Sequence, residues 1–243
     1  MHQEILHLSR GRIFRVVYFL LSTVVVFCSL KVLAPELTNL LLNVYPFSKV
    51  VTVLSGQFAI LLAVTASLLL YELVLAKRDS IFSPRGAWKD YVSCGMGVIF
   101  AFIVFQCLVY FFNVPVSTWE VDYVTQTSGN LHLVYLTSGI IAPLAEELLY
   151  RYILPLAMVE IMKWVISSKR FSMALQVVPV LISSIVFALA HYGSRGFAHL
   201  IYFFVLALWL GYWVSKTSGI SVSFFGHSLA GLLAVTTIYV SEL

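Results

Sequence analysis

Long apolar runs, separated by short polar segments, dominate the pattern of hydrophobic and polar positions along this chain. Most runs approach or exceed the roughly 20 residues that a helix needs to cross a bilayer. Their residues are continuously apolar and do not alternate with polar ones, which favours spanning helices over the strands of a barrel. We expect helices at 13–34, 50–76, 91–113, 133–160, 173–192, 199–215 and 219–241.

The composition agrees with this pattern. The 243 residues are 60% hydrophobic and only 11% charged, with a mean hydropathy of +0.95, which lies far outside the range of soluble domains. We therefore predict an all-α fold, a polytopic transmembrane bundle of about seven helices. Residues 1–132 would form three spans that act as a lateral wall or a route by which substrate enters, and residues 133–243 would form a catalytic core of four spans.

The distribution of lysine and arginine predicts the orientation of the bundle. With the N-terminus in the cytoplasm, basic residues inside outnumber those outside by about three to one, as the positive-inside rule requires. The first run lacks a clear small-residue cleavage site and is interpreted as a retained anchor. We expect a multi-pass protein of a bacterial cytoplasmic membrane, with its C-terminus outside. Its net charge of +4 follows from topology and calls for no nucleic-acid partner.

Three ionisable residues, Glu146, Glu147 and Arg151, lie inside the fourth apolar run. Charged groups at membrane depth are costly and usually functional. Glu147 and Arg151 are four residues apart, so they share a helical face and can form an ion pair, whereas Glu146 points about 100° away. This predicts Glu147 and Arg151 as an orienting pair and Glu146 as the reactive group. The alternative is a structural ion-pair network or part of a proton or ion path.

Two histidines, His191 and His227, lie in similarly apolar surroundings on the fifth and seventh runs. Either one alone would more often be an interfacial or core residue. Together with Glu146 they could polarise a water molecule by general base catalysis, or hold a catalytic divalent metal such as zinc. Both schemes lead to hydrolysis, and in the metal-dependent one Glu146, His191 and His227 would be the ligands.

The other polar residues in the runs have simpler interpretations. We expect Gln57 and Gln106 to form hydrogen bonds between helices, and His199 to lie at a membrane border. The cysteines lack the spacing of a metal site or a disulfide framework and are expected in the core. They are Cys28, Cys94 and Cys107.

The order of three motifs resembles that of a known family. Glu146-Glu147-xxx-Arg151, then Phe187-xxx-His191, then His227 are similar to the CPBP family, also called Abi, of intramembrane proteases, which includes CAAX prenyl endopeptidases and bacteriocin-processing proteins. The resemblance covers roughly residues 133–241. It implies an endopeptidase that cleaves a membrane-associated protein or peptide near or within the bilayer.

The resemblance also implies a role for each motif residue. Glu146 and His191 would activate the attacking water, and His227 would help to stabilise the oxyanion. Glu147 and Arg151 would orient these groups, and Phe187 would support His191 by packing. Mechanisms based on the glutamate alone and on a metal both remain open.

The chain departs from the family at Gly231, where the third motif usually has asparagine four residues after the histidine. An amide that could ligate a metal or donate to an oxyanion is therefore missing. A metal would keep three protein ligands, with water in the open positions. Alternatively, glycine would let a backbone group approach closely.

The depth of the two histidines constrains the fifth helix. If that helix entered the membrane at residue 173, His191 would lie roughly 27 Å from the cytoplasmic face and His227 about 12 Å from it, too far apart to meet. We therefore expect 169–178 to lie along the interface and the helix to enter near Pro179. Residues 193–196 would then be irregular backbone bordering a wet cavity.

Two other functions compete with proteolysis. One is a catalytically silent scaffold or immunity protein of the same fold. The other is a small proton-coupled transporter with a relay of glutamate, arginine and histidine. Short connections and the lack of paired inverted halves count against the transporter.

Overall fold

A computed structural model of the chain describes residues 28–43, 48–75, 86–114, 131–165 and 172–241, together with Val17, Leu21, Val24 and Val25. Nearly all of these residues are helical, and no strand occurs among them. The π-helices are labelled η. The elements are η1 (Ser29–Leu33), α2 (Ala34–Leu42), α3 (Ser48–Leu75), α4 (Trp88–Phe111), α6 (Leu131–Leu136), η3 (Thr137–Ile141), α7 (Ala142–Glu146), η4 (Glu147–Ile153), α8 (Leu154–Val165), α9 (Ser172–Thr217) and α10 (Ser221–Ser241).

Within this part of the chain, five helices are long and apolar enough to cross a membrane. Each matches one of the predicted runs, and a shorter apolar helix, Val177–Tyr192, matches another. The run at 13–34 falls largely outside the described residues. The prediction of an all-α membrane bundle is therefore confirmed. The five spans are Val51–Leu68, Trp88–Phe111, Leu131–Val159, Phe197–Thr217 and Ser221–Val240.

Large apolar side chains cover the outside of the bundle, while several polar ones are buried within it. Phe100, for example, is 70% exposed, and Glu147 is completely buried. Lipid tails are as apolar as these side chains, so exposing them to lipid carries no hydrophobic penalty. The same arrangement corrects the prediction for the cysteines. Cys94 is buried, but Cys28 and Cys107 are exposed and do not lie in the core.

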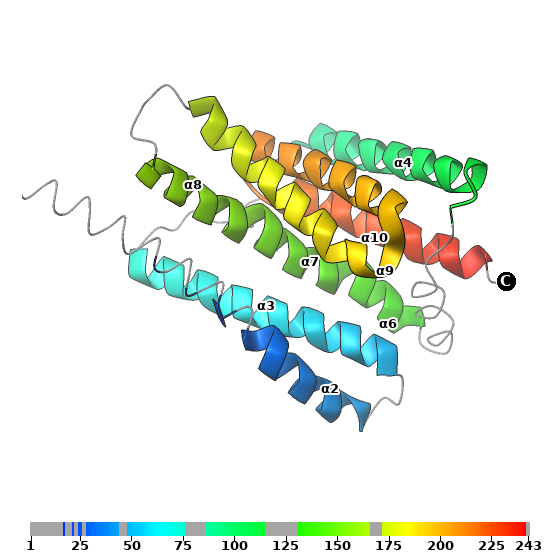
Figure 1. The fold of residues 1–243 in the computed structure, drawn as a ribbon, viewed down its shortest axis with the longest axis horizontal. Coiled ribbons are helices and arrows are strands. Elements are labelled where there is room, and N and C mark those ends of the chain that lie inside the picture. Colours follow the sequence, from blue (N-terminus) through cyan, green and yellow to red (C-terminus); the bar gives the residue numbers. More distant parts are fainter. Residues whose placement is uncertain are drawn as a thin grey trace, which may run out of the picture.

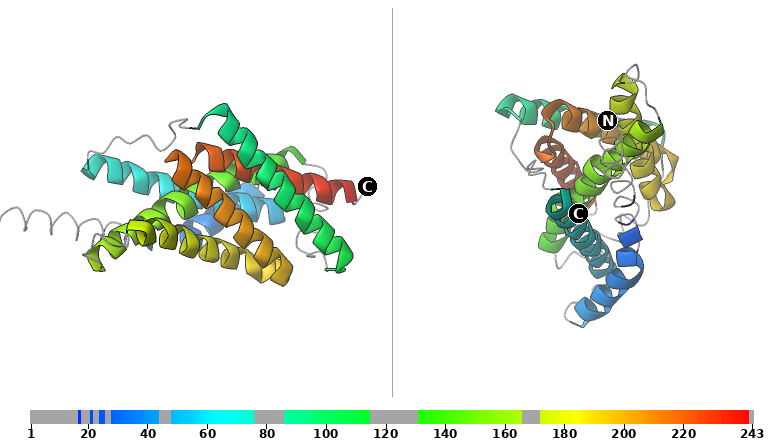
Figure 2. Two further views of the ribbon diagram at one scale, coloured as in Figure 1. Left: turned by 90° about the horizontal axis from the view of Figure 1, so that it is seen from above. Right: turned by 90° about the vertical axis from the view of Figure 1, so that its left-hand side faces the viewer.

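The helical run from α6 to α8 occupies the centre of the molecule. In Figure 1 it crosses between α3 on one side and α9 and α10 on the other, and these helices contact it. α2 packs against the far side of α3, and α4 packs against α9 and α10. Seen from above, α4 runs obliquely to α10 (Figure 2, left). The fourth apolar run, with its charged residues, is thus enclosed by neighbouring helices.

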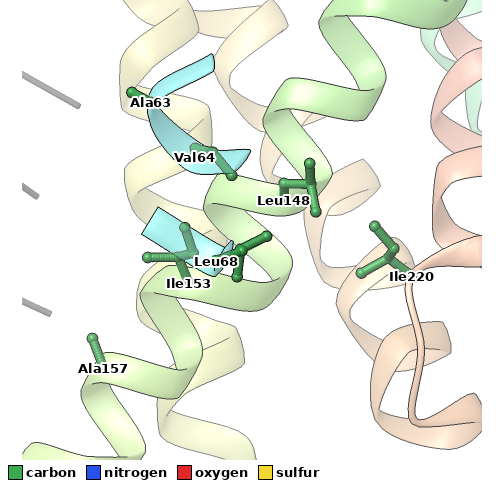
Figure 3. Close-up of a cluster of buried hydrophobic side chains, with 7 residues drawn as sticks. All are labelled: Ala63, Val64, Leu68, Leu148, Ile153, Ala157 and Ile220. Atoms are coloured by element: carbon green, nitrogen blue, oxygen red, sulfur yellow. The ribbon is translucent and has the colours of Figure 1, made fainter. Parts of the chain in front are cut away.

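A cluster of apolar side chains fixes α3 against this central run (Figure 3). Leu148 and Ile153 of η4 meet the α3 residues Val64 and Leu68. Tight van der Waals packing of this kind holds membrane helices together when lipid provides no hydrophobic driving force. The remaining members of the cluster are Ala63, Ala157 and Ile220.

Each of the three π-helices among the described residues ends two residues before a proline. η1 precedes Pro35, η3 precedes Pro143 and η4 precedes Pro155. A proline ring clashes with the carbonyl four residues earlier and cannot donate a hydrogen bond to it. In all three cases that carbonyl lies inside the π-helix, where a wider turn moves it away from the ring and pairs it with a later N–H group. Glu147 and Arg151 lie in one of these wider turns.

α9 is continuous in the sequence, but the chain reverses direction within it, so its two halves lie side by side. Gly211 lies against the side chain of Val180, 31 residues earlier, whereas a straight helix would separate them by roughly 46 Å. The rings of His191 and Phe203 stack with centroids 4.5 Å apart, so the chain reverses between these residues. Figure 1 shows the two limbs, yellow and orange, side by side. Residues 193–196 are helical, so the prediction of irregular backbone there is wrong.

The membrane tolerates this reversal because of the backbone hydrogen bonds within each limb. Each limb is apolar and can bury its backbone hydrogen bonds within its own helix, so lipid tolerates the pair without an extended loop at depth. Pro179 lies inside the first limb, and the apolar part of that limb begins at Val177, close to the expected membrane entrance. His191 therefore ends the first limb at the level of the central run.

Candidate functional site

The carboxylate of Glu146 faces both predicted histidines. Its Oε2 atom lies 3.7 Å from Nε2 of His191 and 3.5 Å from Nε2 of His227. The three side chains come from α7, α9 and α10. At these separations a single water molecule can contact the carboxylate and an imidazole together, because hydrogen bonds of 2.7–3.2 Å close such a triangle. The structure thus brings the three groups to one place.

Both imidazoles are anchored through Nδ1. In His191 this atom lies 2.8 Å from the carbonyl oxygen of Phe187, and in His227 it lies 2.9 Å from Oε1 of Glu147. A carbonyl oxygen only accepts hydrogen bonds, so Nδ1 of His191 must be the donor. An ionised Glu147 requires the same of His227. Anchoring of this kind fixes the orientation of each ring and turns Nε2 toward Glu146.

Glu147 joins Arg151 to His227. Nε of Arg151 lies 3.7 Å from Oε1 of Glu147, the same oxygen that contacts His227. Glu147 and Arg151 are 0% and 4% exposed, so neither charge is solvated by bulk water. The predicted ion pair is present, and the structure adds the hydrogen bond to His227, which spacing did not indicate. An ion pair of this depth serves to hold an imidazole in place and to balance its charge.

Phe187 is the hydrophobic wall of the site. It is completely buried, and its ring centroid lies 4.5 Å from that of His191 and 5.5 Å from that of His227. The guanidinium carbon of Arg151 lies 4.8 Å from the same ring, within the range of a cation–π interaction. The resemblance implied contact with His191 alone. The structure shows that one ring packs against three of the polar groups.

Gln57 contributes to the site, although sequence reasoning did not place it there. Gln57 of α3 donates a hydrogen bond from Nε2 to Oε1 of Glu146, with a separation of 3.1 Å. The expected interhelical bond of Gln57 is therefore confirmed, but its partner was not foreseen. His199 is 6% exposed and packs against the ring of Phe105. Its place at a membrane border stays a prediction. The expectation for Gln106 stays a prediction.

Gly231 is a point of close helix contact. A Cβ atom added there would collide with the backbone carbonyl of Ser138, and one added at Gly139 would lie 2.6 Å from Leu232. These residues form the crossing of α10 with η3, where small residues let two helices approach. An asparagine at position 231 would force the helices apart. The absence of the asparagine amide thus goes with a closer contact between α10 and η3, one helical turn after His227.

Glu146, His191 and His227 are the donor set that a metal would use. Carboxylate oxygen and imidazole nitrogen are suitable ligands for zinc. As the described residues are placed, however, no group of three or more histidine, cysteine, aspartate or glutamate side chains is arranged to hold a metal ion. We therefore assign no step of the chemistry to a metal.

A cavity of about 160 Å³ lies beside Arg151, between α8 and the two limbs of α9. Pro179, Ser183 and Gly211 are among its lining residues. Ser183 also donates a hydrogen bond to the carbonyl oxygen of Tyr150 and so ties the first limb of α9 to η4. The cavity expected at 193–196 involves side chains outside the described set.

Comparison with known families agrees with this geometry. Residues 128–233 match the family model described as type II CAAX prenyl endopeptidase, Rce1-like. This segment is thus similar to the CAAX protease family. The match confirms the resemblance found in the three motifs, and it contains Glu146, Glu147, Arg151, His191 and His227.

The five long apolar helices, together with this match, make the chain an integral membrane protein. The family that it resembles is one of CAAX prenyl endopeptidases. No curated protein and no solved structure matches the chain. Gln57 lies outside the matched segment.

Proposed function

We propose that this protein is an intramembrane endopeptidase that hydrolyses a peptide bond of a membrane-associated protein or peptide. One observation carries the proposal: Oε2 of Glu146 faces Nε2 of both His191 and His227 inside an apolar bundle. Hydrolysis needs a base for water and a donor for the oxyanion, and these three groups can supply both.

In the first step, Glu146 acts as the general base. A water molecule donates one hydrogen bond to Oε2 of Glu146 and the other to Nε2 of His191, which is an acceptor because Nδ1 carries the proton. Glu146 takes a proton as the water oxygen forms a bond to the carbonyl carbon of the substrate. The π electrons of the carbonyl move onto its oxygen and give a tetrahedral oxyanion.

In the second step, His227 stabilises that oxyanion. When protonated, His227 donates from Nε2, and its charge is balanced by Glu147 through Nδ1. This is the role that a buried carboxylate plays behind a catalytic imidazole. The oxyanion then collapses, the carbon–nitrogen bond breaks, and Glu146 returns its proton to the leaving nitrogen. Two chain ends result, a carboxylic acid and an amine, and the acid then loses its proton to water or to the amine.

The surrounding parts of the chain have roles in the same scheme. We propose that residues 133–243 carry the chemistry, and that the helices within 1–132 form a wall past which a membrane-embedded substrate reaches it. We place the N-terminus on the cytoplasmic side and the C-terminus outside, on the basis of the distribution of lysine and arginine.

The decisive experiment compares cleavage by the wild type and by Glu146→Gln in proteoliposomes. The probe is an internally quenched farnesylated peptide with a CAAX-type C-terminus, and mass spectrometry identifies new peptide ends. Loss of a general base is expected to lower kcat by about 10²- to 10⁴-fold. Glu36→Gln, which changes an exposed glutamate of α2, is the matched control and should retain activity.

Two outcomes would change the proposal. Equal cleavage by the wild type and Glu146→Gln would remove Glu146 from the chemistry. A membrane function that survives Glu146→Gln, without any cleavage, would favour a silent scaffold. A parallel sample with a zinc chelator tests the metal-dependent alternative, since only that mechanism predicts loss of activity that added zinc restores.

A further inference from the structure

The side chain of Gln57 reaches the reactive carboxylate from outside the family segment. Its Nε2 atom lies 3.1 Å from Oε1 of Glu146, although the two residues are 89 positions apart. Gln57 belongs to α3, whereas the family match begins at residue 128. Part of the site is therefore built by a helix that the family resemblance does not include.

Among the described residues, the amide of Gln57 makes one hydrogen bond, the one to Glu146. Its other polar atom, Oε1, is buried there without a hydrogen-bond partner. A buried amide costs free energy unless it is paired, and an apolar side chain of similar size would suit the rest of α3 better. The contact with Glu146 is thus the interaction that accounts for a glutamine at this position.

The hydrogen bond divides the two oxygens of Glu146 between different partners. Oε1 accepts from Gln57, and Oε2 faces His191 and His227. A single donor on one oxygen fixes the rotation of the carboxylate plane. The lone pairs of the other oxygen are then directed at the place where a water molecule would bind. Partners of this kind, which orient a reacting group without touching the substrate, usually affect rate strongly.

α3 is rigidly placed for this task. Gln57, Val64 and Leu68 are spaced by seven and four residues, so they lie on one face of the helix. Val64 and Leu68 belong to the apolar cluster that packs against Leu148 and Ile153 (Figure 3). The face that carries Gln57 is therefore the face that is fixed to the central run.

We propose that Gln57 is a positioning residue for Glu146, and that α3 is an integral part of the catalytic site as well as a wall around it. This inference rests on the proposed endopeptidase function. It assigns to the N-terminal helices a direct effect on the rate of the chemical step.

The first test measures kcat and KM of Gln57 variants on the farnesylated peptide in proteoliposomes. Gln57→Leu keeps the volume and removes the donor, and kcat should fall about 10- to 100-fold while KM changes by less than threefold. Gln57→Glu keeps the shape but sets a second carboxylate against Glu146, and it should be slower still at neutral pH. Gln106→Leu changes a partly buried glutamine of α4 and should retain activity.

The order of the variants separates positioning from simple packing. A packing role predicts that leucine, the most apolar replacement, preserves both activity and thermal stability. Retention of wild-type kcat by Gln57→Leu, in a preparation that Glu146→Gln inactivates, would overturn the inference and leave the proposed function intact. Absence of cleavage by the wild type would overturn the proposed function itself.

A second test examines the contact without relying on activity. Cysteines replace Gln57 and Glu146 in a chain whose native cysteines are changed to alanine, and a short bifunctional thiol reagent is added to native membranes. The 57/146 pair should form a cross-link. A pair at 58 and 146 should not, because Phe58 is 40% exposed and lies about 100° around α3. Failure of the first pair to react would contradict the placement of α3.

Discussion

The surroundings of Glu147 and Glu146 differ sharply, although the residues are adjacent in the chain. Glu147 is completely buried, and its partners are a guanidinium and an imidazole. Glu146 is 8% exposed, and its partners are a neutral amide and two imidazole nitrogens that face one oxygen. Glu147 is neutralised by the fixed cation of Arg151, whereas Glu146 keeps one oxygen directed at the space between the two imidazoles. Unequal surroundings are how two acids acquire different tasks.

Removing one charge from each region should produce the largest contrast in stability. Glu147→Gln leaves the guanidinium of Arg151 buried without a counter-charge, and we expect a loss of about 3–5 kcal/mol in the free energy of unfolding. Glu146→Gln keeps a side chain of the same shape and leaves no such cation, so its loss should stay below about 1 kcal/mol. Steric trapping in bicelles measures both. Equal losses would remove the distinction between scaffold and reactive group.

The contrast was partly predictable from the sequence. The spacing of Glu147 and Arg151 indicated their pairing, and the motif order indicated that Phe187 supports His191. The contact between Gln57 and Glu146 could not be foreseen, because it depends on how α3 packs against a helix 89 residues away. Local patterns report which face of a helix is polar, but not which neighbour will meet it.

Two features of the backbone show the same limit. The hydropathy pattern separates the runs 173–192 and 199–215, and α9 reverses between them, but the pattern does not indicate that residues 193–196 are helical. The expectation of irregular backbone there is therefore wrong. Burial of His199 depends likewise on Phe105 of another helix. Helix number and type follow from composition, whereas these placements follow from packing.

The shared partner of the two carboxylates, His227, depends on the position of α10, and Gly231 sets that position. Gly231→Ala forces a Cβ atom against the carbonyl of Ser138, and we expect a loss of about 1–3 kcal/mol through separation of the helices. Activity should fall with it as His227 moves. The matched control is Gly56→Ala on α3, where a new Cβ meets nothing within 4 Å. Thermal unfolding in detergent compares the two, and equal destabilisation would contradict the close crossing.

The smallest effect should come from a carboxylate at the border of the membrane. Asp90 accepts a hydrogen bond from Lys216 at 3.0 Å, and the lysine is 45% exposed. Lys216→Met should lower thermal stability less than Glu147→Gln or Gly231→Ala does, because water screens the pair and solvates Asp90 once it is alone. The same thermal assay measures this change. A loss as large as that of Glu147→Gln would mean that burial does not govern the strength of these ion pairs.

The wider turn at 147–153 has a consequence for how this span can vary in length. A π turn holds about one more residue than the α-helical turn it replaces, so deleting a residue there shortens the sequence while the flanking helices keep their lengths. The side chains on either side would keep their relative orientation, because the extra residue is taken up by one wider turn, but the ring of Pro155 would meet the carbonyl that now avoids it. Related chains that differ by one residue in this span should therefore change the turn and the proline together.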